Sequence, residues 1–231
     1  MNDDPEIPNL ADRLADIASA HQRPAEVRQA INAALAAIEE QGLVPGIPVG
    51  GLAPDFSLPN AVGETVRLAD RLTEGPVVLS FYRGSWCPYC NAELHAYQEA
   101  LPAFRREGAH VIAVSPQAPD DSISLTEKHN LKFDVLSDVH QRVIGAYRIR
   151  YVFPESVKPH LLKGTVAALA RQQPDGRWSL PAPATFVLDP QGVVRARHVS
   201  MAYRTRMEPA AALRVVRDIR SGKAERRRAD G

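Results

Sequence analysis

Short apolar runs alternate with segments whose apolar residues recur at helical spacing, and this alternation predicts an α/β fold. The apolar runs of strand length are 77–82, 111–114, 133–136 and 185–188. Between the first two runs, Leu94, Leu101 and Phe104 fall on one helical face. Strand, helix and strand in this order predict a right-handed parallel crossover at the start of a mixed sheet.

Further helices and strands are expected before and after this strand-helix-strand unit in the sequence. Leu10, Leu14 and Ile17 recur at helical spacing, and a second apolar face begins after Pro24 and ends at Gly42. After a linker at 43–52, the chain predicts a small β-hairpin that turns at 60–63. The segments expected to be helical later in the chain are 122–129, 139–147, an insertion within 151–178, and a last helix from Pro209.

Two local features refine these expectations. Pro102 lies inside the helix that follows the cysteines and is expected to kink it. The turn at 189–192 returns the chain as an antiparallel strand over 193–199. We therefore divide the chain into a helical extension at 1–42, one domain at 43–222, and a disordered basic tail at 223–231.

Composition and charge narrow the functional classes. The 231 residues are 45% hydrophobic, enough for a full core, and 28 basic residues balance 27 acidic ones. This balance gives no reason to expect nucleic acid or a membrane surface as a partner. The acidic start at 1–6 lacks the pattern of a signal peptide, so we expect a soluble protein of the cytoplasm.

The two cysteines of the chain, Cys87 and Cys90, lie where a predicted strand passes into a helix. Unpaired N–H groups at a helix N-terminus favour a thiolate, and Pro88 fits the first helical turn. Two thiols at this spacing can close a disulfide, so that one attacks and the other resolves. In a reducing compartment such a pair favours catalysis over a structural bridge.

A Cys-x-x-Cys pair can also belong to a zinc site, attach haem, or consist of two unreactive thiols. A zinc site is disfavoured because the chain has no further cysteine and no histidines paired at ligand spacing. Haem attachment would need a histidine where Asn91 stands. Two buried, unreactive thiols remain a possible alternative.

Four stretches in this order resemble the peroxiredoxin family, which comprises the alkyl hydroperoxide reductases and thiol-specific antioxidant proteins. They are 53–56, 81–82, 90–93 and 185–189 with Gly192. The resemblance implies a thioredoxin-like α/β sandwich with a mixed central sheet. It also implies a hydroperoxide substrate, reduction by thioredoxin or a similar dithiol, no cofactor, and a possible homodimer.

The chain departs from the family pattern at the activating residues. Peroxiredoxins typically show Pro-x-x-x-Thr-x-x-Cys, often with a Glu three residues later. With Cys90 as the attacking thiol, Glu93 fits, but Arg83 stands at the proline position and Cys87 at the threonine position. Ala184 stands where the family usually has an arginine. Arg83 is a candidate to supply the missing charge from another side of the pocket.

The same segment is also similar to a thioredoxin site, in which Cys87 becomes the exposed nucleophile and Trp86 lies at the rim. In that fold a cis-proline faces the cysteines before a late strand, and Pro183 occupies the matching place. We therefore hypothesise that Pro183 is cis and packs against the cysteine pair.

We expect a thiol peroxidase in which one thiolate of the pair becomes sulfenic acid and the other thiol closes a disulfide. The catalytic candidates are Cys87, Cys90 and Arg83, and Trp86, Pro183 and Glu93 are candidates for the substrate pocket. The alignment favours Cys90 as the attacking thiol, whereas exposure at the helix terminus favours Cys87. A protein thiol-disulfide oxidoreductase and a redox-sensing or scaffold module are the alternative functions.

Overall fold

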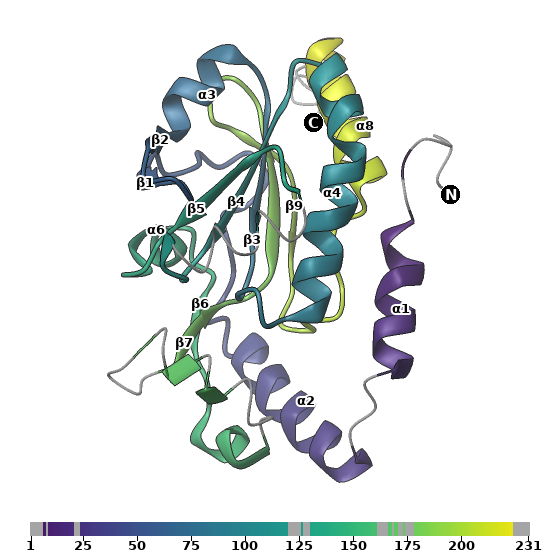
Figure 1. Ribbon diagram of the computed structural model, residues 1–231, viewed down its shortest axis with the longest axis vertical. Coiled ribbons are helices and arrows are strands. Elements are labelled where there is room, and N and C mark those ends of the chain that lie inside the picture. The colour runs from purple at the N-terminus through teal and green to yellow at the C-terminus, as the bar shows by residue number, and fades with distance from the viewer. Residues whose placement is uncertain are drawn as a thin grey trace.

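The computed structural model describes residues 7, 9–20, 24–119, 126, 130–160, 166, 167, 169, 170, 173 and 178–223. A mixed sheet of five strands in the order β5-β4-β3-β8-β9 forms its centre (Figure 1). The strands are β3 (Val77–Phe81), β4 (His110–Ser115), β5 (Asp134–Ser137), β8 (Ala184–Leu188) and β9 (Val194–Val199). The three strands β3, β4 and β5 run parallel, and β8 is antiparallel to β3 and β9. The predicted mixed sheet is confirmed.

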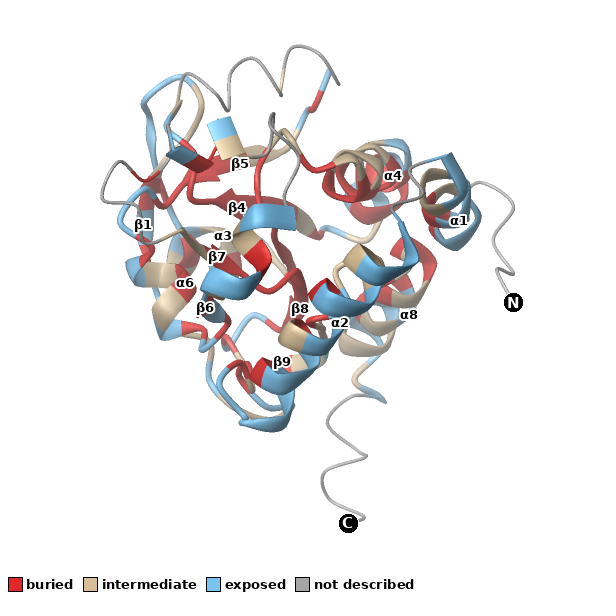
Figure 2. Ribbon diagram, turned by 90° about the horizontal axis from the view of Figure 1, so that it is seen from below, coloured by how far each residue is buried: buried red, intermediate tan, exposed pale blue. Residues whose placement is uncertain are grey.

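Helices pack on both faces of the sheet. Every residue of the central strand β3 is therefore buried. Alternate side chains point to opposite faces, so Val78 joins a core with α4 (Pro88–Arg106) and α8 (Pro209–Arg220). Leu79 and Phe81 face the second core, formed with α2 (Ala25–Glu40), α3 (Leu68–Glu74) and α6 (Arg142–Ala146). The buried residues lie along the strands and the inner sides of these helices, and α2 keeps an exposed outer face (Figure 2).

Both predicted N-terminal helices are present and pack on the main domain. The first, α1 (Leu10–Ala20), lies along α4 and buries Leu10 and Leu14. The second helix, α2, packs against the 3₁₀ helix η1 (Glu155–His160). The carboxylate of Glu208 accepts hydrogen bonds from the backbone N–H groups of Leu10 (3.0 Å) and Ala11 (2.7 Å). The division of the chain at 42/43 stays a prediction.

The predicted hairpin is confirmed, whereas the insertion differs in part from expectation. Strands β1 (Ser57–Pro59) and β2 (Thr65–Arg67) pair antiparallel around a turn at Asn60 to Gly63. In the insertion, β6 (Arg150–Val152) and β7 (Ser179–Pro181) pair as a second small sheet that was not predicted. Three-residue strands containing proline or charged residues show no period-2 pattern long enough to detect.

Some expectations fall on parts of the chain outside the described residues. These are most of the helix at 122–129, parts of the inserted helix, and nearly all of the tail at 223–231. The long helix α4 continues through Pro102 to Arg106. In the described part of the chain, no helix is long and apolar enough to cross a membrane.

Candidate active site

The cysteine pair lies where β3 ends and α4 begins. Cys87 is the N-cap of α4 in an extended conformation, and Pro88 is its first residue. Both thiols are free, and both are buried, with Cys87 2% exposed and Cys90 0% exposed. The predicted strand-to-helix placement of the pair is therefore confirmed.

The loop between β3 and α4 is held from the neighbouring strand. Gln117 follows β4, which is parallel to β3, so both segments leave the sheet at the same edge. Its Oε1 accepts from the backbone N–H of Ser85 (2.6 Å), and its Nε2 donates to Ser85 Oγ (3.0 Å). Gly84 has φ 142°, and a Cβ there would lie 2.6 Å from Trp86 Nε1. This position therefore favours glycine.

A buried ion pair lies behind Cys90. Arg206 Nε donates to Glu93 Oε2 at 2.6 Å, and neither side chain is exposed. Arg206 Nη2 lies 3.4 Å from Cys90 Sγ. Thr185 Oγ1, on β8, donates to Glu93 Oε1 at 3.1 Å. Glu93 therefore orients an arginine that contacts the cysteine pair.

Arg206 is the functional residue that the sequence did not reveal. The family pattern places an arginine at the position of Ala184, on β8, whereas Arg206 lies in the loop between β9 and α8. Its Nη1 donates to the backbone oxygens of Tyr203 (2.6 Å) and Thr205 (2.7 Å), which fixes the guanidinium in this loop. No motif surrounds it, so only the fold identifies it.

The surroundings separate the two thiols electrostatically. Burial opposes ionisation of Cys87, but the hydrogen bond from Cys90 and the charges of Arg83 and Arg206 lower the pKa of Cys87 to about 6. Burial and the hydrogen bond to Cys87 raise the pKa of Cys90 well above its ordinary value. The arrangement favours a thiolate at Cys87 and a protonated thiol at Cys90.

Glu93 also has a shifted pKa. Burial raises the pKa of this carboxyl to about 7, although the attraction of Arg206 lowers it. Burial and salt bridge thus act in opposite directions, and burial is the larger effect. The pair of Glu93 with Arg206 is held together inside the protein rather than at its surface.

Arg83 lies beside the cysteines, as the sequence predicted. It is 5% exposed, and its guanidinium carbon lies 4.8 Å from the ring centre of Trp86 and 4.9 Å from that of Tyr203. Burial opposes its charge, but Tyr151, Cys87 and Cys90 raise its pKa. Its Nε is buried and has no hydrogen-bond partner within the described part of the protein.

The hypothesis of a cis-proline at Pro183 is wrong. The Ala182–Pro183 peptide bond is trans, as no described peptide bond is cis. Ala182 N donates to Ile149 O (2.7 Å), and Pro183 O accepts from Ser200 N (3.3 Å). The chain therefore runs straight from β7 into β8. Pro183 is still buried at the sheet edge where the cysteine loop lies, because the next residue, Ala184, pairs with Phe81.

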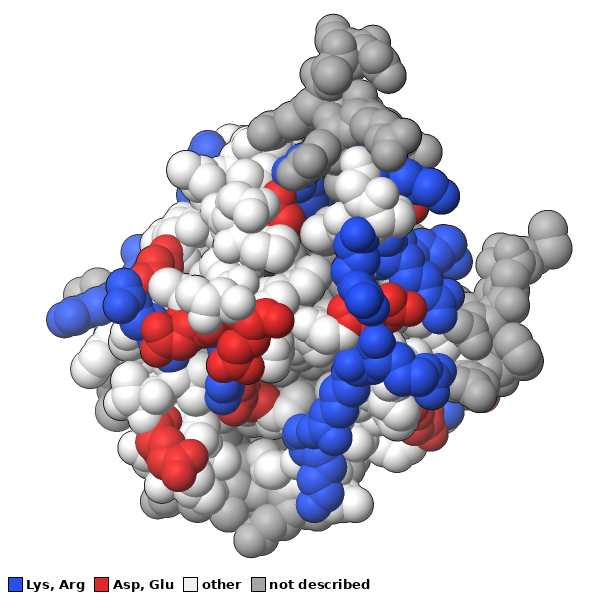
Figure 3. Space-filling model, turned by 90° about the horizontal axis from the view of Figure 1, so that it is seen from above, with Lys and Arg blue, Asp and Glu red and all other residues white. Residues whose placement is uncertain are grey.

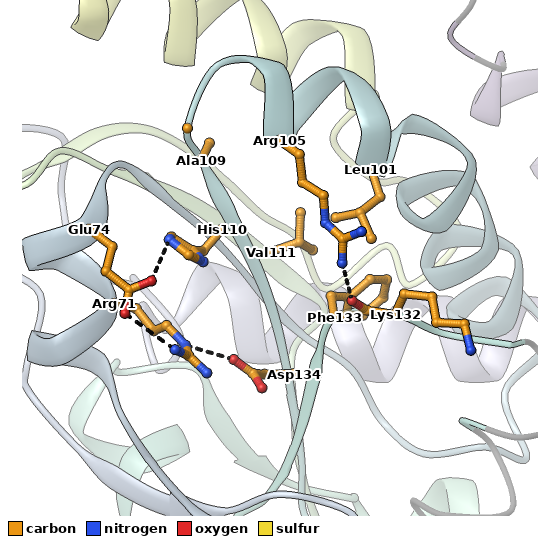
Figure 4. Close-up of a pocket in the computed structure, with 11 residues that line it drawn as sticks. Arg71, Glu74, Leu101, Arg105, Ala109, His110, Val111, Lys132, Phe133 and Asp134 are labelled. Carbon is orange, nitrogen blue, oxygen red and sulfur yellow. Dashed lines mark hydrogen bonds and ion pairs between the residues drawn. The ribbon is translucent and has the colours of Figure 1, made fainter.

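At the end of the sheet opposite the cysteine loop, a groove with a volume of about 570 Å³ is lined by residues of α3, α4, β4 and β5. Basic side chains gather there over the ends of α4 and α8, with acidic ones over α3 (Figure 3). Inside the groove, Arg71 binds Asp134 (2.9 Å) and Glu74 (3.4 Å), and His110 lies 3.2 Å from Glu74 (Figure 4). Carboxylates thus pair with Arg71 and His110 in this groove, whereas Arg105 donates to the backbone oxygen of Lys132. Neither cysteine lines the groove.

Comparison with known proteins agrees with this geometry. Residues 49–197 match the AhpC/TSA family. The chain belongs to this family. Among relatives, chloroplastic peroxiredoxin Q of Triticum aestivum is 29% identical over 155 residues, which cover 67% of this chain and 60% of that protein. The thiol-disulfide oxidoreductase ResA of Geobacillus kaustophilus is 33% identical over 104 residues, which cover 45% of this chain and 59% of the relative.

Solved structures of peroxiredoxins have the same fold. Peroxidoxin BcpB of Mycobacterium tuberculosis superposes with a TM-score of 0.59 at 20% identity, covering 76% of this chain and 97% of that chain. Peroxiredoxin 6 of Arenicola marina gives a TM-score of 0.60 at 18% identity, covering 76% and 74%. The AhpC/TSA chain therefore has the expected thioredoxin-like fold.

Proposed function

We propose that this protein is a thiol peroxidase in which Cys87 attacks a hydroperoxide and Cys90 resolves the product. The observation that carries the proposal is the position of Cys87 at the N-cap of α4, with Cys90 inside the first turn. The lowered pKa of Cys87 and the raised pKa of Cys90 agree with this position. A thiolate is the nucleophilic form, and the attacking thiol works best with a pKa near the ambient pH. Cys87 meets this condition, which reverses the role that the family alignment favours.

The reaction takes place in two steps. The Cys87 sulfur bonds to one peroxide oxygen, the O–O bond breaks, and the other oxygen leaves as an alcohol or water after taking a proton. The resulting sulfenic acid is attacked by the Cys90 sulfur, so that a disulfide forms and water leaves. Two electrons from thioredoxin or a similar dithiol then restore both thiols.

The two arginines have different roles in this scheme. Arg83 and Arg206 both lower the pKa of Cys87, and only Arg206 is also held by a carboxylate, that of Glu93. Positive charge fixed in advance beside the reacting sulfur stabilises the thiolate and the negative charge that develops on the leaving oxygen. We assign Arg83 to catalysis and Glu93 to positioning Arg206.

The runner-up function is exchange with protein disulfides. It is supported by the likeness to thiol-disulfide oxidoreductase ResA and by the Trp86-Cys-x-x-Cys90 segment. The same low pKa of Cys87 would serve this reaction equally well. The two functions differ in their preferred oxidant.

The deciding experiment is the second-order rate at which the fully reduced protein consumes hydrogen peroxide and an organic hydroperoxide. We expect a rate orders of magnitude above that of a free thiol. Cys90→Ser should retain this first step and label as a sulfenic acid, whereas Cys87→Ser should lose both. A rate like that of a free thiol, together with fast insulin reduction, would establish the disulfide function instead. Slow turnover in both assays would favour a redox-sensing module.

A further inference from the structure

Arginines gather around Tyr203 at the cysteine loop. The guanidinium carbon of Arg83 lies 4.9 Å from the Tyr203 ring centre, and that of Arg204 lies 5.6 Å from it. Arg206 completes the cluster, and its guanidinium binds Glu93. Within the described residues, neither Arg83 nor Arg204 forms an ion pair with a carboxylate.

Both of these arginines have unused hydrogen-bond donors. The Nε atoms of Arg83 and Arg204 are buried and have no acceptor within the ranges described above. The rings of Trp86 and Tyr203 contact the Arg83 guanidinium, so its in-plane N–H groups are what can bind an acceptor. A buried donor without an acceptor costs free energy, which an incoming oxygen acceptor would recover.

One arginine in the groove at the opposite end of the sheet shows what carboxylate pairing looks like in this protein. There, Arg71 is offset by Asp134 and Glu74 (Figure 4). At the cysteine loop, the groups whose negative charge raises the pKa of Arg83 are thiols and tyrosines of the described residues, not carboxylates. An anion is therefore the ligand that suits this cluster.

We propose that Arg83 and Arg204 bind a carboxylate of the substrate, so that the protein prefers oxidants in which a carboxylate accompanies the reacting O–O or S–S bond. Arg204 is partly exposed and can meet the anion first, whereas Arg83 is buried beside the cysteines. Arginine suits this task because its planar N–H groups match the two oxygens of a carboxylate. This inference rests on the proposed reaction at Cys87.

The test uses full-length reduced protein and matched pairs of oxidants. Cumene hydroperoxide is compared with its 4-carboxylate, and bis(2-hydroxyethyl) disulfide with dithiodipropionate, by the second-order rate of protein oxidation. We expect at least one carboxylate compound to react about tenfold faster than its neutral partner, and added salt to reduce this preference. Whichever pair shows the preference identifies the source of the carboxylate.

The variant Arg204→Gln tests carboxylate binding separately from catalysis, because Arg204 is not among the residues that we assign to the reaction at Cys87. We expect this variant to lose most of the preference while its rate with the neutral oxidant stays unchanged. Arg105→Gln removes the same charge at the far end, where Arg105 donates to Lys132 O, and should keep the preference. An unchanged preference in Arg204→Gln, or none in the wild-type protein, would overturn the inference.

Binding of an unreactive compound separates this inference from the proposed function. Isothermal titration compares 4-isopropylbenzoate with the neutral 4-isopropylbenzamide. The wild-type protein should bind the benzoate about tenfold more tightly, and Arg204→Gln should lose the difference. Slow peroxide consumption with intact benzoate preference would contradict only the peroxidase. Fast consumption with no benzoate preference would contradict only the carboxylate site.

Discussion

In the proposed reaction, the two cysteines differ in their thiol pKa values. Both thiols are buried, and the charges of Arg83 and Arg206 lower the pKa of each. Both thiols share the same helix terminus, so the helix dipole alone does not separate them. Their pKa values separate because the hydrogen bond between the thiols lowers the pKa of Cys87 and raises that of Cys90.

The low pKa of Cys87 predicts the pH profile of its reactions. Because only the thiolate reacts, the rate should rise with pH through about 6 and level off above it. An ordinary thiol would instead rise through about 8.5. Thiolate absorbance and iodoacetamide alkylation, followed against pH, both measure this midpoint.

Arg83→Gln should move that midpoint upward, toward the ordinary thiol value, because a positive charge beside the sulfur is lost. The matched control is Arg105→Gln, which removes a charge far from the cysteines. A midpoint that does not move in Arg83→Gln would contradict the role assigned to Arg83.

The buried ion pair predicts strong coupling between its partners. Burial already raises the pKa of Glu93 to about 7, and Arg206→Gln removes the counter-ion that keeps this carboxyl ionised. Above pH 7 we therefore expect a loss of up to about 3–5 kcal/mol in the free energy of unfolding. Adding Glu93→Gln removes the unpaired carboxyl and should restore much of this loss. Urea unfolding of both single variants and the double variant measures the coupling. Additive losses would show that the pair is not coupled.

Helix α1 is hydrogen-bonded to the segment that follows Arg206. Its first N–H groups are bound by Glu208, two residues beyond Arg206. Leu10 and Leu14 share an apolar cluster with Cys87 and Cys90. The N-terminal helix therefore contributes to the enclosure of the thiols.

Glu208→Ala should loosen α1, because its N-terminal N–H groups lose an acceptor. We expect a cost of about 1 kcal/mol, typical of a lost helix cap, and faster hydrogen exchange within α1 (Leu10–Ala20). Glu107→Ala is the control, since Glu107 pairs with Arg217 and Arg220 at the far end. Equal exchange in the two variants would rule out this role of Glu208.

The elements with long, regular patterns could be predicted from the sequence, and the site only in part. The strand at 77–82 and the cysteine helix were found because burial imposes period and composition over many residues. Arg206 and the strand pair β6–β7 were not, because tertiary contacts position them. The hypothesis about Pro183 failed because it was transferred from a related fold, while local hydrogen bonds keep this segment extended.

At the scale of the whole molecule, the two ends of the sheet differ in how their charges are offset. At the end seen in Figure 3, basic and acidic side chains gather mostly on different sides, and ion pairs such as Arg71–Asp134 and Arg217–Glu107 occur there. At the cysteine end, two arginines lack such partners within the described ranges. A molecule that is nearly neutral in total, with 28 basic and 27 acidic residues, thus carries two arginines without a carboxylate partner among the described residues at its cysteine end.

The burial of both thiols has a kinetic consequence. In the proposed reaction, a peroxide would be small enough to reach the buried Cys87 through a brief fluctuation, whereas a protein dithiol would reach the disulfide only if the surrounding loop opened. Recovery would then proceed no faster than this opening, however much reductant is supplied. Under steady oxidant the protein would accumulate as its disulfide, and the number of molecules, rather than the supply of electrons, would limit how much peroxide is removed.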